Sequence, residues 1–280
     1  MEDNKGITIV FMARMSNLPA LLPTPQEITA SRDYLRPPTG RFVVRVGQHY
    51  VVKYGPNVNF QEGYSMVFVS QRTAVPVPKL YAMFCDEATK NNFIVMEAIG
   101  GHSLGDVWAG LAPNGKKEIT SQLHTYMGML RGIRPPDYLG GVGHKPIKNQ
   151  ILTECINKYE CNNGEPAIYS MAGPWRNEER LVDAISWKLA MKMSSRQGDF
   201  YLRQLPQVLR GHDTVFTHGD LNRENVMVQE DGSLVLIDWE YSGFLPSFWE
   251  YCMCFFCHDF DDDWHEAVPK FLEEWPAEYA

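Results

Sequence analysis

The stretch from Thr217 to Asp238, THGDLNRENVMVQEDGSLVLID, decides how the rest of the chain is interpreted. Its two β-prone runs, Val226 to Gln229 and Leu234 to Ile237, are separated by a segment that contains Asp-Gly. Asp-Gly between apolar runs is a strong short-range hairpin signal. The stretch therefore predicts two antiparallel strands joined by a turn centred between Asp231 and Gly232.

Polar side chains gather at the open end of this predicted hairpin. Asn225 and Asp238 lie equally far from the turn, so they should face each other with Cβ atoms roughly 5 Å apart. An amide oxygen and a carboxylate that converge in this way suit a hard cation that is shared with phosphates, and Mg²⁺ is the expected ion. Asp220, in the loop that leads into the hairpin, brings a second carboxylate to the same point, where it is placed to act as a base.

The order Asp220, Asn225, Asp238 matches the catalytic base, metal-binding Asn and metal-binding Asp of kinases. Each residue alone has a simpler interpretation, because Asp and Asn in loops usually cap turns and an Asp often just ends a strand. The three together, with His218 and Gly219 directly before Asp220, favour the catalytic interpretation.

Composition narrows the class of protein. The chain has 280 residues, with 44% hydrophobic and 21% charged residues, which suits a globular protein of one large domain or two lobes. A formal net charge of -8 without a Lys/Arg-rich block argues against nucleic acid or an anionic membrane as partner. No run reaches transmembrane length, and the early apolar run Ile7 to Met12 is too short for a signal peptide. We therefore expect a cytoplasmic protein.

The six cysteines are too few and too clustered for a disulfide framework, so we expect reduced thiols. The motif Cys254-x-x-Cys257-His258 suggests zinc, but no second Cys/His pair follows at finger-like spacing. The neighbours of these cysteines are mostly apolar, which favours a buried helix with small hydrophobic thiols.

The N-terminal part predicts a second hairpin and a helix. Arg41 to Val46 and His49 to Tyr54 are rich in β-branched and aromatic residues, and a helical stretch, Phe60 to Arg72, follows them. Glu62 in this helix is positioned to hold Lys53, which would then reach nucleotide phosphates as a point charge. The alternative is that both side chains simply face water.

A predicted strand, Phe93 to Met96, leads into the glycine pair Gly100-Gly101, which indicates a hinge between two lobes. Backbone groups just before the glycines are candidates for binding the edge of an adenine ring, although a plain exit from a strand would look the same. These residues are Met96, Glu97, Ala98 and Ile99.

The remaining segments are predicted to be mostly helical. Apolar spacing predicts helices over Lys116 to Ile133, Asn177 to Lys192 and Asp199 to His212, and a buried helix that begins at Trp249. Residues 134–176 are rich in Gly, Pro and Asn and look like an insertion that could border a substrate pocket. A short helix is expected near Pro25 to Tyr34.

With these residues placed, the chain resembles the aminoglycoside phosphotransferase family, most closely its fungal-type members, over roughly residues 41–280. The motifs that carry the resemblance are Val-Val-Lys53-Tyr-Gly, the helix with Glu62, Val75-Pro-Val-Pro78-Lys, His218-Gly-Asp-Leu-Asn-Arg-Glu-Asn225, and Ile237-Asp-Trp-Glu-Tyr-Ser-Gly243 with Pro246 and Trp249. The run from His218 to Asn225 is the most specific of them.

The resemblance implies an α+β, protein-kinase-like fold with two lobes. Residues 1–98 would form a small antiparallel-sheet lobe and residues 99–280 a larger, mainly helical lobe, with ATP between them. It also implies Asp220 as base, Asn225 and Asp238 as Mg²⁺ ligands, and Lys53 on the phosphates.

The chain departs from protein kinases in several places. No glycine-rich loop precedes Phe42, where only Thr39-Gly40 is available, and Trp239-Glu240 replaces the Phe-Gly that follows the metal-binding Asp. Gly219 stands where regulated protein kinases carry an Arg, and no Ala-Pro-Glu element follows Asp238. These departures favour a small-molecule acceptor and leave two alternatives open, an inactive nucleotide-binding scaffold and a protein Ser/Thr kinase.

We expect the acceptor to be a small hydroxyl compound that carries amines. The candidate amine-binding carboxylates are Glu240, Glu250, Asp259 and the run Asp261 to Asp263, although charge runs are usually solvated. The sequence carries no motif that identifies the acceptor or the oligomeric state.

Overall fold

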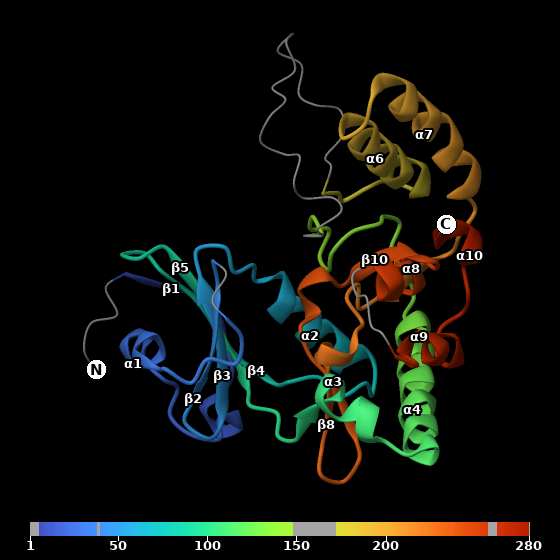
Figure 1. Ribbon diagram of the computed structural model, residues 1–280. Helices are drawn as coiled ribbons and strands as arrows, with labels where there is room; N and C mark the ends of the chain where they lie inside the picture. The colour runs from blue at the N-terminus through green and yellow to red at the C-terminus, as the bar shows by residue number, and fades with distance from the viewer. Residues whose placement is uncertain (1–5, 38–39, 148–171, 257–261, 280) are drawn as a thin grey trace.

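The computed structural model describes residues 6–37, 40–147, 172–256 and 262–279 (Figure 1). A lobe built on a five-stranded antiparallel sheet lies beside a larger lobe that contains most of the helices. The sheet comes from residues between 7 and 97, and the elements of the larger lobe follow it in the chain. None of the described helices is long and apolar enough to cross a lipid bilayer.

The five strands are arranged in the order β1-β4-β5-β3-β2. Their bounds are β1 Ile7–Met12, β2 Phe42–Val46, β3 Tyr50–Gly55, β4 Leu80–Asp86 and β5 Asn91–Glu97. The predicted hairpin of β2 and β3 is confirmed. Strands β1 and β4 were not predicted from the sequence.

Strand alternation sends side chains to opposite faces of this sheet. Phe84 and Phe93 are paired and pack on the face that also buries Ile28 of helix α1 (Pro25–Ala30). Met83 and Ile94, the next pair, pack on the other face against helix α2 (Gln61–Arg72). Lys53 lies opposite Ile94 in the register, so its side chain points to the α2 face, where Glu62 lies.

Helix α2 confirms the helix predicted over Phe60 to Arg72 and packs closely on the sheet. A Cβ atom added at Gly63 would lie 2.3 Å from the sulfur of the buried Met83, so a larger residue there would have to displace the Met83 side chain. The same helix packs on the 3₁₀ turn Trp239–Tyr241 of the larger lobe. It therefore links the Lys53 strand to the segment that follows Asp238.

The predicted hairpin forms as β8 (Val226–Val228) and β9 (Leu234–Leu236), but the expected register is wrong. Its loop has three residues, since Gln229 and Ser233 are joined by a backbone hydrogen bond and Gly232 adopts φ +80°. The turn is therefore centred on Asp231, and Ile237, not Asp238, faces Asn225. Strand β6 (His102–Ser103) adds to β8 and completes a three-stranded sheet.

The helices of the larger lobe are α3 Leu104–Val107, α4 Pro113–Arg131, α6 Glu178–Met191, α7 Ser195–Val208, α8 Trp249–Phe256, α9 Trp264–Ala267 and α10 Pro276–Tyr279. The predicted helices over 116–133, 177–192 and from 249 are confirmed, whereas α7 begins and ends four residues before the expected bounds. An additional strand pair, β7 (Thr214–Thr217) with β10 (Gly243–Pro246), holds both ends of the central stretch together.

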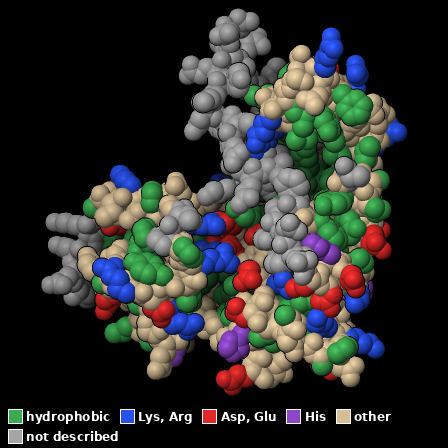
Figure 2. All heavy atoms as spheres, viewed as in Figure 1, with side chains coloured by type: hydrophobic (Ala, Val, Ile, Leu, Met, Phe, Trp, Pro, Cys, Tyr) green, Lys and Arg blue, Asp and Glu red, His purple; other side chains and the backbone are tan. Residues whose placement is uncertain are grey.

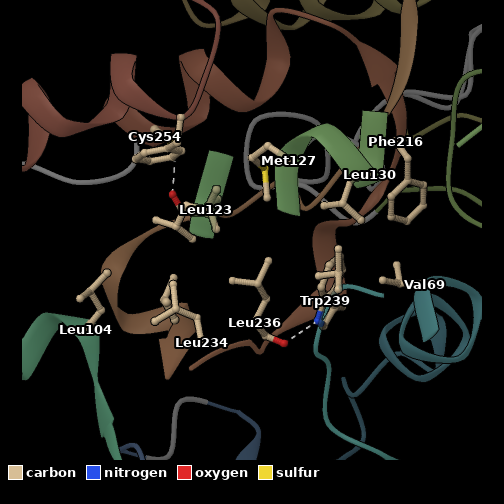
Figure 3. Close-up of a cluster of buried hydrophobic side chains, with 14 of the residues drawn as sticks. Val69, Leu104, Leu123, Met127, Leu130, Phe216, Leu234, Leu236, Trp239 and Cys254 are labelled. Carbon is tan, nitrogen blue, oxygen red and sulfur yellow. Dashed lines mark hydrogen bonds between the residues drawn. The ribbon is translucent and has the colours of Figure 1, made fainter. Parts of the chain in front are cut away.

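The main core lies between α4 and the β8–β9 hairpin (Figure 3). Leu123, Met127 and Leu130 of α4 point toward Leu234 and Leu236 of β9 and toward Trp239. The Trp239 indole N–H donates to the Leu236 carbonyl at 2.8 Å, so the fully buried ring is also satisfied as a polar group. The hairpin is thus fixed by the core on this side, which positions the residues at its open end.

Much of the insertion-like segment 134–176 lies outside the described residues, but both of its ends pack on the larger lobe. Leu139 pairs with Trp175, and Gly140 pairs with Phe244 of β10. The segment is therefore attached to the strand that follows the Asp238 turn.

Candidate active site

A continuous series of polar contacts joins the predicted site residues of the two lobes. The Asn225 amide donates to the Asp220 carboxylate at 2.8 Å, and the Lys53 ammonium lies 2.7 Å from both Asp238 and Glu62. Figure 2 shows acidic and basic side chains gathered where the two lobes face each other. The structure therefore brings together Lys53, Glu62, Asp220, Asn225 and Asp238, which lie far apart in the sequence.

The Asp220 loop is held by side-chain amides. Asn225 donates to both the carbonyl and the carboxylate of Asp220, and Asn222 donates to the same two groups at 3.2 Å. The Asp220 side chain is only half-buried, whereas Asn222 and Asn225 are buried. The Asp220 carboxylate is thus oriented by two side-chain amides and is partly exposed to solvent, which suits a base that receives a proton.

Glu250 of α8 holds the same loop from the other side. Its buried carboxylate accepts backbone N–H bonds from His218, Gly219 and Leu221 at 2.6–3.2 Å. The expectation that Glu250 binds a substrate amine is therefore wrong, because both of its oxygens are taken by the backbone. Glu250 is a positioning residue that the sequence could not reveal, since nothing in the motif places α8 against the loop.

Gly219 is required by this close packing. It adopts φ +81°, and a Cβ atom there would lie 2.4 Å from the Tyr241 carbonyl oxygen. His218 next to it bonds the Ile237 carbonyl through Nε2 at 2.9 Å, and its ring lies 4.5 Å from that of Trp239. These contacts tie the Asp220 loop to the end of β9.

Asp238 adopts a left-handed backbone with φ 63° and ψ 63°, which costs a non-glycine residue about 1–2 kcal/mol. This conformation turns the chain away from β9 and directs the carboxylate toward Lys53. Asp238 and Asn225 thus remain close although they are not paired across the hairpin. A single guanidinium, that of Arg36, contacts both side chains at 3.0 Å.

Charges in this cluster are strongly coupled. Burial alone would lower the pKa of the Lys53 ammonium, but the carboxylates of Asp238 and Glu62 outweigh burial and raise this pKa to about 12. Burial would likewise raise the pKa of Asp238, but Lys53 and Arg36 hold it well below its ordinary value. Burial raises the pKa of Glu62 to about 7, against the attraction of Lys53. Lys53 and Asp238 are accordingly charged at neutral pH.

Two arginines that the sequence analysis did not assign also belong to the cluster. Arg36 contacts Asp238 and Asn225, and Arg41 pairs with Glu240. The only sequence signal is that they flank Pro37-Pro-Thr-Gly40 where a glycine-rich loop was sought. With Lys53, Asp238, Pro37 and Val43 they line a cavity of about 290 Å³.

The donor set fits a magnesium ion. The Asn225 amide oxygen and an Asp238 carboxylate oxygen accept from the two terminal nitrogens of one cation, the Arg36 guanidinium, so both oxygens face the same positively charged group. Oxygen ligands from one carboxylate and few other protein groups are what Mg²⁺ uses when phosphates and water supply the rest. No group of three or more His, Cys, Asp or Glu side chains in the described part of the chain forms a metal site of its own.

The hinge residues are partly occupied by bonds within the protein. The Glu97 N–H donates to the Lys79 carbonyl, and the Ala98 N–H donates to the His49 carbonyl, both at 2.9 Å. Met96 is buried as the partner of Val51 in the sheet. The N–H groups of Glu97 and Ala98 are therefore engaged within the protein. The prediction that Met96, Glu97, Ala98 and Ile99 contact adenine stays a prediction.

The other proposed amine-binding carboxylates are also paired with the protein's own groups. Glu240 is buried and pairs with Arg41, Asp262 pairs with Arg223 at 2.5 Å, and Asp263 pairs with Lys116 at 2.8 Å. Asp259 and Asp261 lie outside the described residues. The prediction that Glu240 binds an amine of the acceptor is therefore wrong, and Asp262 and Asp263 form ion pairs with Arg223 and Lys116 instead.

The buried-thiol interpretation is supported for Cys254. Its side chain is buried in the core and donates to the Leu221 carbonyl at 3.0 Å. Cys257 and His258 lie outside the described residues, so the absence of zinc stays a prediction.

The chain matches the phosphotransferase enzyme family over residues 30–280. It belongs to this family. The predicted family resemblance and the predicted enzyme class, a phosphotransferase, are confirmed. The fungal-type assignment stays a prediction. Comparison with curated protein sequences gave no match.

Solved structures confirm the protein-kinase-like fold. The gentamicin complex of the aminoglycoside phosphotransferase APH(2")-IIa is similar with a TM-score of 0.54 and 13% identity, over 88% of this chain and 77% of that one. A thermostable mutant of APH(4)-Ia in its apo form has a TM-score of 0.53 and 13% identity, over 78% of this chain and 70% of that one. The ADP-bound enzyme APH(2'')-Ib has a TM-score of 0.53 and 13% identity, over 88% of this chain and 76% of that one.

Proposed function

We propose that this protein transfers the γ-phosphate of ATP to a hydroxyl group of a small molecule. The observation that carries the proposal is the series of contacts from Asp220 through Asn225, Arg36 and Asp238 to Lys53. It places a half-exposed carboxylate, two convergent oxygen ligands and a buried ammonium in one cluster. Phosphoryl transfer needs these groups, because catalysis rests on positioning and on compensating the phosphate charge.

Each group has one role in the proposal. Asp220 accepts the proton of the acceptor hydroxyl, Asn225 and Asp238 hold Mg²⁺, and Lys53, kept in place by Glu62, binds the phosphates. When bound, Mg²⁺ would supply neutralisation of the phosphate charge. The sheet lobe, residues 1–98, and the helical lobe, residues 99–280, would hold ATP between them, with the backbone of residues 96–99 at the adenine edge.

Two observations support a small-molecule acceptor over a protein. After Asp238 the chain makes one 3₁₀ turn and enters β10 at Gly243, so this fully described stretch holds no long activation segment. The structure of APH(2")-IIa contains gentamicin, and one structure of APH(4)-Ia contains ADP and hygromycin B. The acceptor of the present protein need not carry amines, since the described candidate carboxylates, Glu240, Glu250, Asp262 and Asp263, bind groups of the protein itself.

A second candidate function is a nucleotide-binding scaffold that transfers no phosphate. The contact of Arg36 with Asn225 and Asp238 favours it, because a bound guanidinium competes with a metal ion for the same oxygens. The two functions differ in one outcome, which is whether a phosphorylated product forms.

The test is to incubate the protein with Mg²⁺, ATP and a mixed panel of aminoglycosides, amino alcohols, sugars and a protein substrate, and to detect products by mass. The proposal expects a gain of one phosphate on a small hydroxyl compound. Asp220→Asn should lose this product, and Asp199→Asn on α7 is its matched control, since this exposed carboxylate lies outside the cluster. Phosphate only on the protein substrate would contradict the proposal, and binding of Mg·ATP with no product would favour the scaffold.

A further inference from the structure

The segment before β2 adds a short strand pair beside the Lys53 cavity. Tyr34 pairs antiparallel with Val44, and the bonds Leu35 N–H to Val43 and Arg45 N–H to Asp33 extend this pairing. The register places Arg36 opposite Phe42, so Pro37 and Arg41 are the two ends of the loop between them. This loop occupies the position in the chain where the sequence analysis found no glycine-rich loop.

This loop cannot bind phosphate in the way that a glycine-rich loop does. Such loops present several backbone N–H groups to a phosphate, whereas Pro37 and Pro38 have no N–H to donate. Gly40 is the single glycine of the loop. Instead, Arg36 directly precedes the loop and Arg41 ends it, and both arginines line the cavity with Lys53.

The end of β3 fixes the second arginine beside the cavity. Gly55 has φ +141°, and a Cβ atom there would lie 3.3 Å from the Gly40 carbonyl oxygen and 3.4 Å from the Arg41 Cα. The end of the loop and the Lys53 strand are thus in close contact. Arg41 in turn pairs with the buried Glu240, which keeps its guanidinium directed toward the cluster.

Arg36 is exposed enough to break its contacts with Asp238 and Asn225. Its side chain is 42% exposed, whereas its partner Asp238 is 5% exposed. In the protein without ligand, Arg36 donates to the second carboxylate oxygen of Asp238, whose other oxygen contacts Lys53, and to the amide oxygen of Asn225. A cation that arrives with a nucleotide would replace it there, and the planar fork of its guanidinium suits the oxygens of the incoming phosphates.

We infer that Arg36 and Arg41 are phosphate-binding residues that together take over the part of a glycine-rich loop. Arg36 exchanges the oxygens of Asp238 and Asn225 for those of the nucleotide phosphates. The inference rests on the proposed function in that it needs the nucleotide to enter this cavity. It adds two residues and a mode of phosphate binding through side chains.

The test compares affinities for Mg·ATP and for adenosine, which has no phosphate, by calorimetry and competition. In Arg36→Ala and in Arg41→Ala, the Kd for Mg·ATP should rise by roughly 10- to 100-fold, the usual value of a charge-assisted hydrogen bond. The Kd for adenosine should stay unchanged, because the hinge is untouched. Arg45→Ala is the matched control, since Arg45 lies on the same strand pair, faces Asp33 and does not line the cavity.

Each other outcome has a defined meaning. If all three variants bind Mg·ATP as tightly as the unmodified protein, the inference is overturned. Equal losses of affinity for ATP and for adenosine would also overturn it, because the loop would then have only a structural role. Tighter Mg·ATP binding in Arg36→Ala would overturn it too, and would identify Arg36 as a competitor of the metal. If the unmodified protein binds neither ligand, the proposed function itself fails, whereas unaffected variants of a protein that binds ATP refute only this inference.

Discussion

The two sides of the charged cluster are built in different ways. The side formed by residues 217–238 is fixed, because Asn225 and Asp238 are buried and Glu250 holds the backbone of the loop before them. The side that carries Arg36 and Arg41 is adjustable, because these side chains remain 42% and 28% exposed and are held mainly by ion pairs. This difference in burial separates the residues proposed for catalysis and metal binding from the two arginines proposed to move onto the nucleotide phosphates.

The largest effect is expected on the fixed side at Asp220. Asp220→Asn keeps the shape of the side chain and removes the base, so phosphate transfer should fall by roughly 10²–10⁴-fold. Initial rates with an acceptor found in the panel measure the effect, and the affinity for Mg·ATP should be unchanged. Turnover close to that of the unmodified protein would remove Asp220 from its role.

The next effect concerns stability and tests how strongly the fixed side is held. Glu250→Ala leaves three buried N–H donors without their carboxylate, so the free energy of unfolding should fall by at least about 3 kcal/mol. Denaturant unfolding measures the loss. Glu273→Ala is the control, since Glu273 is exposed and its Arg131 contact spans 3.7 Å. Similar losses in both variants would refute the positioning role of Glu250.

A pair of glycines sharpens the comparison further. Gly219 and Gly232 have nearly the same φ, +81° and +80°, but their surroundings differ. A Cβ atom at Gly219 would lie 2.4 Å from a backbone oxygen, whereas one at Gly232 would meet nothing within 4 Å. Gly232→Ala should cost about 1 kcal/mol from conformation alone, and Gly219→Ala should cost clearly more. Thermal unfolding of both variants measures the difference, and equal losses would mean that the Asp220 loop adapts and is not fixed.

The sequence predicted the fixed side far better than the adjustable one. The Asp-Gly turn and the order of Asp220, Asn225 and Asp238 are local patterns, so they were recognised without a structure. The one-residue error in register arose because a three-residue loop with a left-handed glycine also fits Asp-Gly. Its consequence for the site was small, since the left-handed backbone of Asp238 returns its side chain to the cluster.

Residues whose roles depend on tertiary contacts could not be found in this way. Glu250 reaches the Asp220 loop from a helix further along the chain, and a buried carboxylate that binds backbone N–H groups has no sequence signature. Arg36 lies in a Pro-rich stretch without a clear strand pattern and becomes a neighbour of Asp238 only through pairing with β2. Asp262 and Asp263 were predicted to bind amines for the same reason. Their partners Arg223 and Lys116 are remote in sequence, so the ion pairs could not be recognised without the structure.

The central claim is that Asp238 and Asn225 bind the metal that accompanies the nucleotide, and calorimetry of ATP binding with and without Mg²⁺ tests it most directly. The unmodified protein should bind ATP in a magnesium-dependent manner, and Asp238→Ala should lose that dependence because it removes a charged ligand. This measurement requires no knowledge of the acceptor. Equal Mg·ATP affinity in the unmodified protein and in Asp238→Ala would contradict the account.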